Sequence, residues 1–335
     1  MKLTLNESTR LILAHAFGDA LPDRTLVVFA CGGLNNRLRV LCSGLVLAEI
    51  TGRAFAMLWP RTPNCGAPFD SLFQNRWPVV DLPTVPAELR PFYISSWSDK
   101  RLRLFLKNSH QHVIMGYYSW LFGGPQVKTA FVSLRERCET LATKLQPAEM
   151  IASQVETFRA RHFSPTMIGV HLRRADFHPH DIHNTNPALR AVDRYLEQEP
   201  QAGILLCTDD GAVDPATGQP TTKEGVHVSF KKRYGNRVVW HTPRSLDPQV
   251  PEAVQDALVD LWLLRATDYF VGTYSSSFSG MAVVGRSIPH IFCATQTAMD
   301  DRLEKIINAI GLGRLLRFAV YQHFGSELPF PLAWR

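Results

Sequence analysis

The second half of the chain alternates short apolar segments with segments of helical spacing, and this alternation limits the possible folds more than any other feature. Strands that are apolar along their whole length are typical of parallel sheets that helices cover on both faces. The sequence therefore predicts an α/β fold. The expected strands are 168–172, 204–208, 238–240, 269–272 and 290–293, and the expected helices are 187–199, 252–266 and 279–285.

The first half begins with a strand, a glycine turn, a helix and a second strand. An apolar run over 26–31 ends at Gly32-Gly33, and a stripe of leucines at helical spacing begins directly after it. Gly52 closes that helix, and a short apolar strand follows at 54–58. This order is the start of a second α/β domain.

The length of the chain allows two domains. Its 335 residues are too many for one ordinary core and enough for two. Residues 60–145 give no clean period, and a helical pattern then runs over 135–161 until Ser164-Pro165 breaks it. Because a new strand–helix series starts directly after this break, we predict domains at 1–164 and 165–335.

Composition and charge exclude several classes of protein. The 36 basic and 30 acidic residues give a net charge of +6 without any block of like charge, which suits an anionic ligand such as a nucleotide and is too weak for nucleic acid. The six cysteines show no metal-ligand spacing, so we expect no metal. No run approaches the ~18 apolar residues of a membrane span, and we see no signal segment. We therefore expect a cytoplasmic protein without an integral membrane segment.

Polar residues follow three of the predicted parallel strands. Ligands of such sheets bind beyond the carboxyl ends of the strands, so these residues can meet one ligand. They are Arg173-Arg174 after 168–172, Asp209-Asp210 after 204–208 and Ser275-Ser276-Ser277 after 269–272.

His171 and Arg173 face the same side of their strand, because side chains alternate along it. An arginine at a strand end can bind a pyrophosphate through two hydrogen bonds and stabilise the charge of a leaving group. His171 can hydrogen-bond a base or a ribose. Alternatively, Arg173 and Arg174 pair with acidic neighbours, of which Asp176 is the obvious one.

The carboxylates admit two interpretations each. Asp209 and Asp210 bind ribose hydroxyls or a guanine edge, or they cap the start of a loop. Asp260 lies in the apolar segment 257–264, where an unpaired carboxylate would be costly. It is therefore either a satisfied buried residue or a ligand group, and the two adjacent N–H donors of guanine suit a carboxylate.

Two further segments can bind phosphate. Gly33, Asn35, Asn36 and Arg37 lie where the first predicted strand turns into a helix, and the amides of a first helical turn attract anions. The alternative is a simple glycine turn with an asparagine cap and a surface arginine. The serines at 275–277 offer hydroxyls to phosphate, or they cap the helix that follows. No phosphate-binding loop of the P-loop type is present.

Together, these segments resemble the conserved motifs of GDP-fucose-dependent fucosyltransferases. The resemblance is strongest to the α-1,6 group, which includes the nodulation chitooligosaccharide and core N-glycan enzymes, and weaker to the protein O-fucosyltransferases. It extends from residue 32 to about residue 286 and rests on the order of five short motifs. They are Gly33-Leu34-Asn35-Asn36-Arg37, His171-Leu172-Arg173-Arg174-Ala175-Asp176, Cys207-Thr208-Asp209-Asp210, Asp260 in its apolar helix, and Thr273-Tyr274-Ser275-Ser276-Ser277-Phe278.

The resemblance implies a role for each motif. Arg173 matches the arginine at the donor β-phosphate, and His171 and Asp260 match the pair that recognises guanine. Asn36 matches the asparagine near the donor phosphate and sugar. Ser276 and Ser277 match the phosphate-binding motif, although the core N-glycan enzymes have glutamine at the position of Ser277.

The loop after the arginine pair departs from the family. Phe177 stands where the core N-glycan enzymes have a lysine, and Asp181 stands where they have a glutamate. Asp181 is therefore the candidate catalytic base.

The resemblance also implies the architecture and the reaction. We expect two Rossmann-like domains facing a cleft, the GT-B type, with the glycine loop and the acceptor side in 1–164 and the GDP-sugar donor in 165–335. The expected reaction is inverting, metal-independent transfer of fucose from GDP-fucose to a hydroxyl of a glycan or glycoconjugate, without a cofactor. GDP-mannose or an ADP-heptose as donor, and non-catalytic nucleotide-sugar binding, are the alternatives.

The acceptor is not specified by the sequence. The aromatic residues between 93 and 120 form either a platform for an acceptor sugar or part of a core, and the second is the commoner case. They are Tyr93, Trp97, Tyr117, Tyr118 and Trp120.

Overall fold

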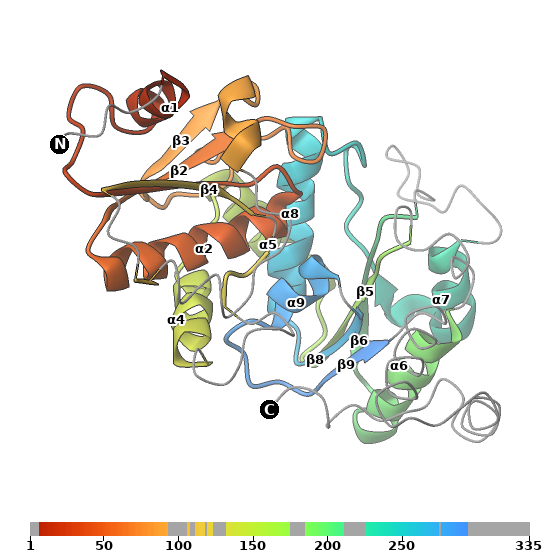
Figure 1. Cartoon of the computed structure of the whole chain (residues 1–335). Coiled ribbons are helices and arrows are strands. Elements are labelled where there is room, and N and C mark those ends of the chain that lie inside the picture. Colours follow the sequence, from red (N-terminus) through yellow and green to blue (C-terminus); the bar gives the residue numbers. More distant parts are fainter. Residues whose placement is uncertain are drawn as a thin grey trace, which may run out of the picture. The chain divides into compact units, whose positions relative to one another are not determined.

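The fold is described from a computed structural model of the chain (Figure 1). The residues that it describes are 7–92, 106–107, 111–117, 119–122, 132–174, 185–210, 225–274 and 276–293. The chain divides into two compact units, and each of them contains one sheet. The first unit is Met1–Ser153 with Asp247–Leu258, and the second is Gln154–Leu246 with Val259–Arg335.

The first unit contains a parallel sheet with the strand order β3-β2-β1-β4. Its strands are β1 (Thr25–Phe29), β2 (Ala54–Pro60), β3 (Val79–Leu82) and β4 (His112–Gly116). Its helices are α1 (Glu7–Phe17), α2 (Leu34–Thr51), the 3-10 helix η1 (Ala87–Phe92) and α4 (Val132–Thr143).

Helices cover both faces of this sheet, as Figure 1 shows for α1 and α2. Ile12 and Leu13 of α1 are buried in one core cluster with Val27 and Phe29 of β1. On the other face, a Cβ added at Gly44 of α2 would lie 3.1 Å from the Val28 side chain. Alternate residues of β1 therefore point to opposite helices, which explains why the strand is apolar throughout.

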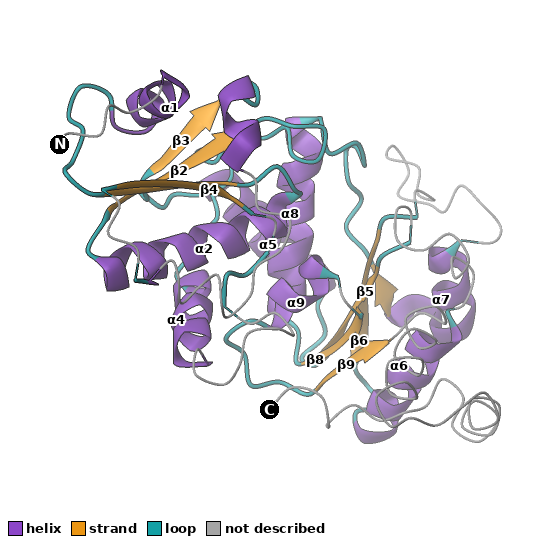
Figure 2. Ribbon diagram, viewed as in Figure 1, coloured by secondary structure: helices purple, strands orange, loops and turns teal. Residues whose placement is uncertain are grey.

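The second unit contains a five-stranded parallel sheet with the order β7-β6-β5-β8-β9 (Figure 2). Its strands are β5 (Met167–Leu172), β6 (Gly203–Thr208), β7 (Val238–Val239), β8 (Tyr269–Thr273) and β9 (His290–Cys293). The helices are α6 (Asn186–Gln198), α7 (Val226–Tyr234), the 3-10 helix η3 (Gly235–Arg237) and α9 (Ser277–Val283). α5 (Glu149–His162) and α8 (Pro251–Arg265) each contribute residues to both units.

The core of the second unit follows the same rule as the first. Ile168 and Val170 of β5 pack in one cluster with Ala191 and Val192 of α6. Between them Gly169 points to the other face, where an added Cβ would lie 2.6 Å from the hydroxyl of Thr267, directly after α8. The glycine in β5 therefore lets α8 pack closely on the sheet.

The α/β fold class predicted from the sequence is confirmed, and the predicted strands match the observed ones to within two residues at each end. The helix predicted over 135–161 is wrong, because α4 and α5 are separate helices. Pro147 lacks an N–H group and disfavours a helical residue before it, and it pairs with Phe73 in an isolated β-bridge. The prediction also missed α7, which begins where the irregular segment 211–225 was expected to end.

No helix in the part of the chain that the structure describes is long and apolar enough to cross a membrane.

A tight contact within the first unit leads to a prediction of stability. The Gly66 amide donates a hydrogen bond to the carbonyl of Pro248 (2.8 Å), and a Cβ at Gly66 would lie 1.9 Å from the carbonyl oxygen of Gln249. We expect Gly66→Ala to lower the free energy of unfolding by about 2 kcal/mol, because the backbone must move to admit the methyl group. Gly33→Ala is the control, since its added Cβ meets its nearest atom at 3.6 Å. Equal melting temperatures for the two variants would contradict this packing.

Candidate functional site

The main chain of Arg173 is fixed at the carboxyl edge of the second sheet. Its amide donates to the hydroxyl of Thr273 (2.9 Å), and this hydroxyl donates to the carbonyl of His171 (3.2 Å). Thr273 ends β8, the strand beside β5. One threonine therefore joins the ends of two neighbouring strands and fixes the position of the Arg173 main chain.

His171 is buried and held by α9. The residue is 7% exposed. Its Nδ1 is 2.7 Å from the hydroxyl of Ser279, and its ring stacks on Phe278 with 4.6 Å between the ring centroids. The same Ser279 hydroxyl accepts from the amide of Thr273 (3.0 Å). Because Nδ1 is used inside the protein, a contact of His171 with a base or ribose, as predicted, is limited to Nε2.

The ring of His171 is uncharged at neutral pH. Burial, and secondly the positive charge of Arg173, lower the pKa of His171 to about 3. Because the ring is neutral, His171 adds no second positive charge beside the guanidinium of Arg173.

The two carboxylates after β6 organise the loop ends around them. Asp209 accepts a hydrogen bond from the amide of Arg174 (2.5 Å), and Asp210 accepts one from the amide of Val226 at the start of α7 (2.8 Å). His227 lies beside Asp210, with 3.6 Å between Nδ1 and Oδ1. Burial raises the pKa of Asp210, but the His227 ring, the Val226 amide and Arg174 outweigh it, and the net pKa is lowered.

These contacts favour the structural interpretation of the carboxylate pair. Asp209 and Asp210 hold the start of the loop after β5 and the start of α7, which is the capping alternative stated above. The side chain of Arg174 is buried (7% exposed), and burial lowers its pKa against the opposing effect of the two carboxylates. A direct contact of Arg174 or Asp209 with the donor stays a prediction.

Asp260 has a partner that the sequence did not suggest. Its Oδ1 lies 3.0 Å from Nδ1 of His241, the second residue after β7, and each side chain is 17% exposed. The carboxylate predicted to read guanine is thus half-buried and hydrogen-bonded.

The serine cluster caps α9. Ser276 is buried, and its hydroxyl accepts from the amide of Ser279 (3.4 Å). This supports the capping alternative for Ser276, while Ser277 is half-buried at the first helical position. Ser275 and the candidate base Asp181 lie outside the described residues. Within the described ranges no group of three or more His, Cys, Asp or Glu side chains could hold a metal ion.

The glycine turn of the first unit rules out the alternative in which Arg37 is a surface arginine. Arg37 is fully buried, and its guanidinium donates to the carbonyls of Gly32 (2.8 Å) and Pro60 (2.6 Å) and to the hydroxyl of Thr62 (2.8 Å). It also lies over the Trp59 ring, 5.0 Å from its centroid. Arg37 is therefore no surface arginine: its side chain holds the turn from within the core, and its predicted contact with the donor stays a prediction.

The other residues of this turn are arranged around the start of α2. Gly33 is the N-cap of α2, and its carbonyl accepts from the amides of Asn36 (3.1 Å) and Arg37 (3.2 Å). Asn36 is half-buried and packs against Gly32. The amide oxygen of Asn35 is buried and has no hydrogen-bond partner, which is costly unless a ligand supplies one. The predicted donor contacts of Gly33, Asn35 and Asn36 remain predictions.

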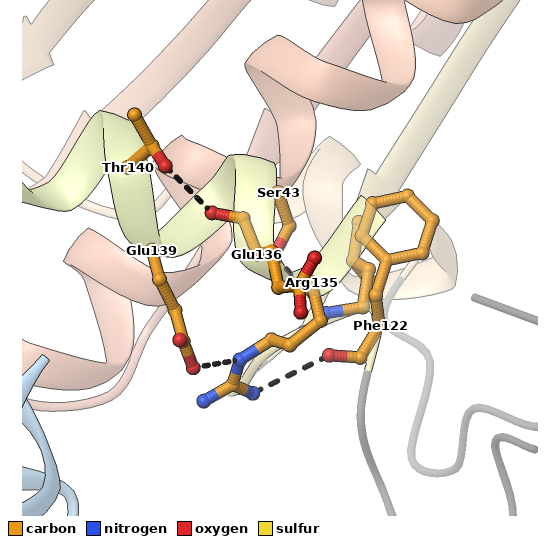
Figure 3. A network of polar contacts seen from close by, with 7 residues as sticks. Ser43, Phe122, Arg135, Glu136, Glu139 and Thr140 are labelled. Atoms are coloured by element: carbon orange, nitrogen blue, oxygen red, sulfur yellow. Dashed lines mark hydrogen bonds and ion pairs between the residues drawn. The ribbon is translucent and has the colours of Figure 1, made fainter. Parts of the chain in front are cut away.

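Of the aromatic residues considered for an acceptor platform, Tyr117 and Trp120 are buried, at 8% and 6% exposure. The guanidinium of Arg135 in α4 lies 4.0 Å from the centroid of the Trp120 ring. Figure 3 shows that Arg135 also donates hydrogen bonds to Glu139 and to the carbonyl of Phe122. These two aromatics are core residues, as the commoner interpretation held. The other members, Tyr93, Trp97 and Tyr118, lie outside the described residues.

The sequence did not indicate the roles of Ser279 and His241. Ser279 lies inside a short helix, and nothing in its surroundings in the sequence marks it as the partner of His171. His241 follows a predicted strand directly, so the rule that ligand groups follow parallel strands would have found it.

Acid stability should depend on His171. Its pKa is about 3 in the folded protein against an ordinary 6.5, so between these values the unfolded chain binds the extra proton and stability rises with pH. The contribution approaches about 1.4 kcal/mol for each pH unit in this window. We expect His171→Asn to flatten the stability profile measured by urea unfolding between pH 4 and 7. Parallel profiles for the variant and the wild type would contradict the buried, neutral ring.

No protein-family model and no curated protein matches the sequence. Among solved structures, the chain is similar to NodZ α-1,6-fucosyltransferase soaked with GDP-fucose, with 16% identity, a TM-score of 0.51 and coverage of 78% of this chain and 93% of that chain. Fucosyltransferase NodZ from Bradyrhizobium gives a TM-score of 0.49 over the same shares, at 16% identity. POFUT1 in complex with GDP-fucose gives 0.48, with 13% identity and coverage of 83% and 99%. The chain therefore has the two-sheet α/β fold of the NodZ fucosyltransferase, the GT-B type.

Proposed function

We propose that this chain is an inverting, metal-independent glycosyltransferase that transfers fucose from GDP-fucose to a hydroxyl of a glycan or glycoconjugate. One observation supports this most. The main chain of Arg173 is fixed by Thr273 at the carboxyl edge of the sheet, and the neighbouring His171 is kept neutral by burial. The fold and the order of the motifs agree with this donor. The NodZ structure to which this chain is similar is that of an α-1,6-fucosyltransferase soaked with GDP-fucose.

In the proposed reaction the bond between the fucose anomeric carbon and the β-phosphate oxygen breaks, and its electron pair goes to the phosphate. Arg173 offsets the charge that develops there, which is the role a metal ion plays in other transferases. The acceptor hydroxyl attacks the anomeric carbon from the opposite face and so inverts it. Its proton goes to Asp181 or to the departing phosphate.

The second unit would bind the GDP part of the donor through Arg173, His171 and Asp260. Asn35, with its buried unpaired amide oxygen, is the first unit's best candidate for a ligand contact. We propose a cytoplasmic location, which the free state of all six cysteines supports.

Calorimetric titration with GDP, ADP and UDP in EDTA tests the donor class. The proposal expects GDP to bind at least about ten-fold more tightly than the other two, because a carboxylate at Asp260 accepts from both N–H groups of guanine. Tighter binding of ADP would favour the heptosyltransferase alternative. Binding that requires a divalent metal would refute metal independence.

A further inference from the structure

His241 and Asp260 form a hydrogen-bonded pair in the second unit that joins two elements far apart in the sequence. Asp260 lies on α8 and His241 follows β7, the edge strand of the sheet. Nδ1 of His241 and Oδ1 of Asp260 are 3.0 Å apart, and each side chain is 17% exposed. The pair is therefore buried enough to have a fixed geometry and open enough to be reached.

The direction of the bond follows from chemistry. An ionised carboxylate can only accept, so the hydrogen must lie on Nδ1 and His241 must be the donor. A neutral ring bonded in this way has its lone pair on Nε2. A carboxylate has about four lone-pair sites, so the bond from His241 does not by itself prevent Asp260 from accepting hydrogen bonds from a ligand.

The imidazole of His241 packs against α5, whereas the neighbouring Trp240 packs against α7. Trp240 points to the face of α7, where its ring packs edge-on against His227 with centroids 5.0 Å apart. His241 points the other way, and its ring packs edge-on against Phe158 of α5, 6.2 Å between centroids and 89° between planes. Phe158 in turn lies 4.5 Å from the ring of His162. This row of rings restricts the rotation of His241 and hence the direction of its N–H.

We propose that His241 is a positioning residue for base recognition: it fixes the carboxylate of Asp260 so that this group selects guanine. The inference rests on the proposed function, in which Asp260 accepts from the two adjacent N–H donors of guanine. Adenine offers one N–H donor beside a ring-nitrogen acceptor. The second oxygen of a fixed carboxylate would face that nitrogen, and the two acceptors would repel each other. A carboxylate that can rotate avoids this repulsion, so selectivity depends on the bond from His241.

The test compares two substitutions that differ in one donor. His241→Phe keeps an aromatic ring against Phe158 but removes the N–H, whereas His241→Asn places an amide N–H close to the position of Nδ1. Titration with GDP and ADP is expected to show about ten-fold weaker GDP binding for the Phe variant and a smaller ratio of GDP to ADP affinity. The Asn variant should retain most of both. In an Asp260→Ala background, His241→Phe should have no further effect.

The outcomes separate the inference from the function on which it rests. A His241→Phe variant with the wild-type ratio of GDP to ADP affinity overturns the positioning role, as does an Asn variant that behaves like the Phe variant. Failure of the wild type to bind GDP, or unchanged GDP binding by Asp260→Ala, removes the guanine site itself and the inference with it. Melting curves of each variant identify any that fail to fold, and the Asn variant then decides the question.

Discussion

Arg173→Ala is expected to lower the rate of fucosyl transfer by a factor on the order of 10²–10³, the usual cost of removing one group that stabilises developing charge. The main-chain amide of Arg173 makes the bond to Thr273, so an alanine keeps that bond and the end of β5 stays in place. The loss should therefore appear in kcat and in GDP affinity, while the variant still folds.

Two further substitutions identify what Arg173 supplies. Arg173→Lys keeps the charge and loses the forked geometry of the guanidinium, so it should fall between the wild type and the alanine variant. Arg237→Ala is the matched control, because Arg237 is an exposed arginine of the same unit that donates to the carbonyl of Pro200. Near-normal turnover by Arg173→Ala would refute its role at the leaving group.

Arg37→Met is expected to lower the free energy of unfolding by about 3 kcal/mol or more, because two buried acceptors and one half-buried acceptor lose their donor at a cost of about 1–3 kcal/mol each. Methionine fills much of the space but offers no hydrogen. The carbonyls of Gly32 and Pro60 and the hydroxyl of Thr62 would be left without the bonds that now join the glycine turn to β2.

Thermal and urea unfolding measure this loss, and Arg10→Met is the control, since Arg10 is exposed on α1 in the same unit. A loss confined to donor affinity, with normal stability, would instead indicate that Arg37 is a ligand of the donor phosphate. Equal small effects of the two substitutions would show that the three bonds contribute little.

The sequence predicted the parallel sheets well because their strands are apolar on both faces and end in glycine or polar residues. β5 and β6 are examples, and Gly52 was placed correctly as the end of α2, where it adopts φ 59°. β3 and β4 were missed because their apolar runs, Val79-Val80 and Val113-Ile114-Met115, are too short to stand out in the sequence. Their place depends on contacts with β2 and β1 that are distant in the sequence.

The candidate site could be predicted by residue type but not by role. Arg37 reads as a surface arginine beside a glycine turn, and only the fold shows that it is buried beneath that turn. The capping function of Ser276 and the pairing of His171 with Ser279 likewise depend on a short helix returning to the strand end. Burial and long-range pairing are properties of the packed chain, and local sequence patterns do not contain them.

Turnover of GDP-fucose in EDTA, without any acceptor, tests the central claim most directly. The proposed site predicts slow release of free fucose and GDP, because water can replace the acceptor hydroxyl once Arg173 stabilises the leaving phosphate. It also predicts that Arg173→Ala reduces this release on the order of 10²–10³-fold. Release at the uncatalysed rate by the wild type, despite tight binding of GDP, would contradict the account and indicate a protein that only binds nucleotide sugars.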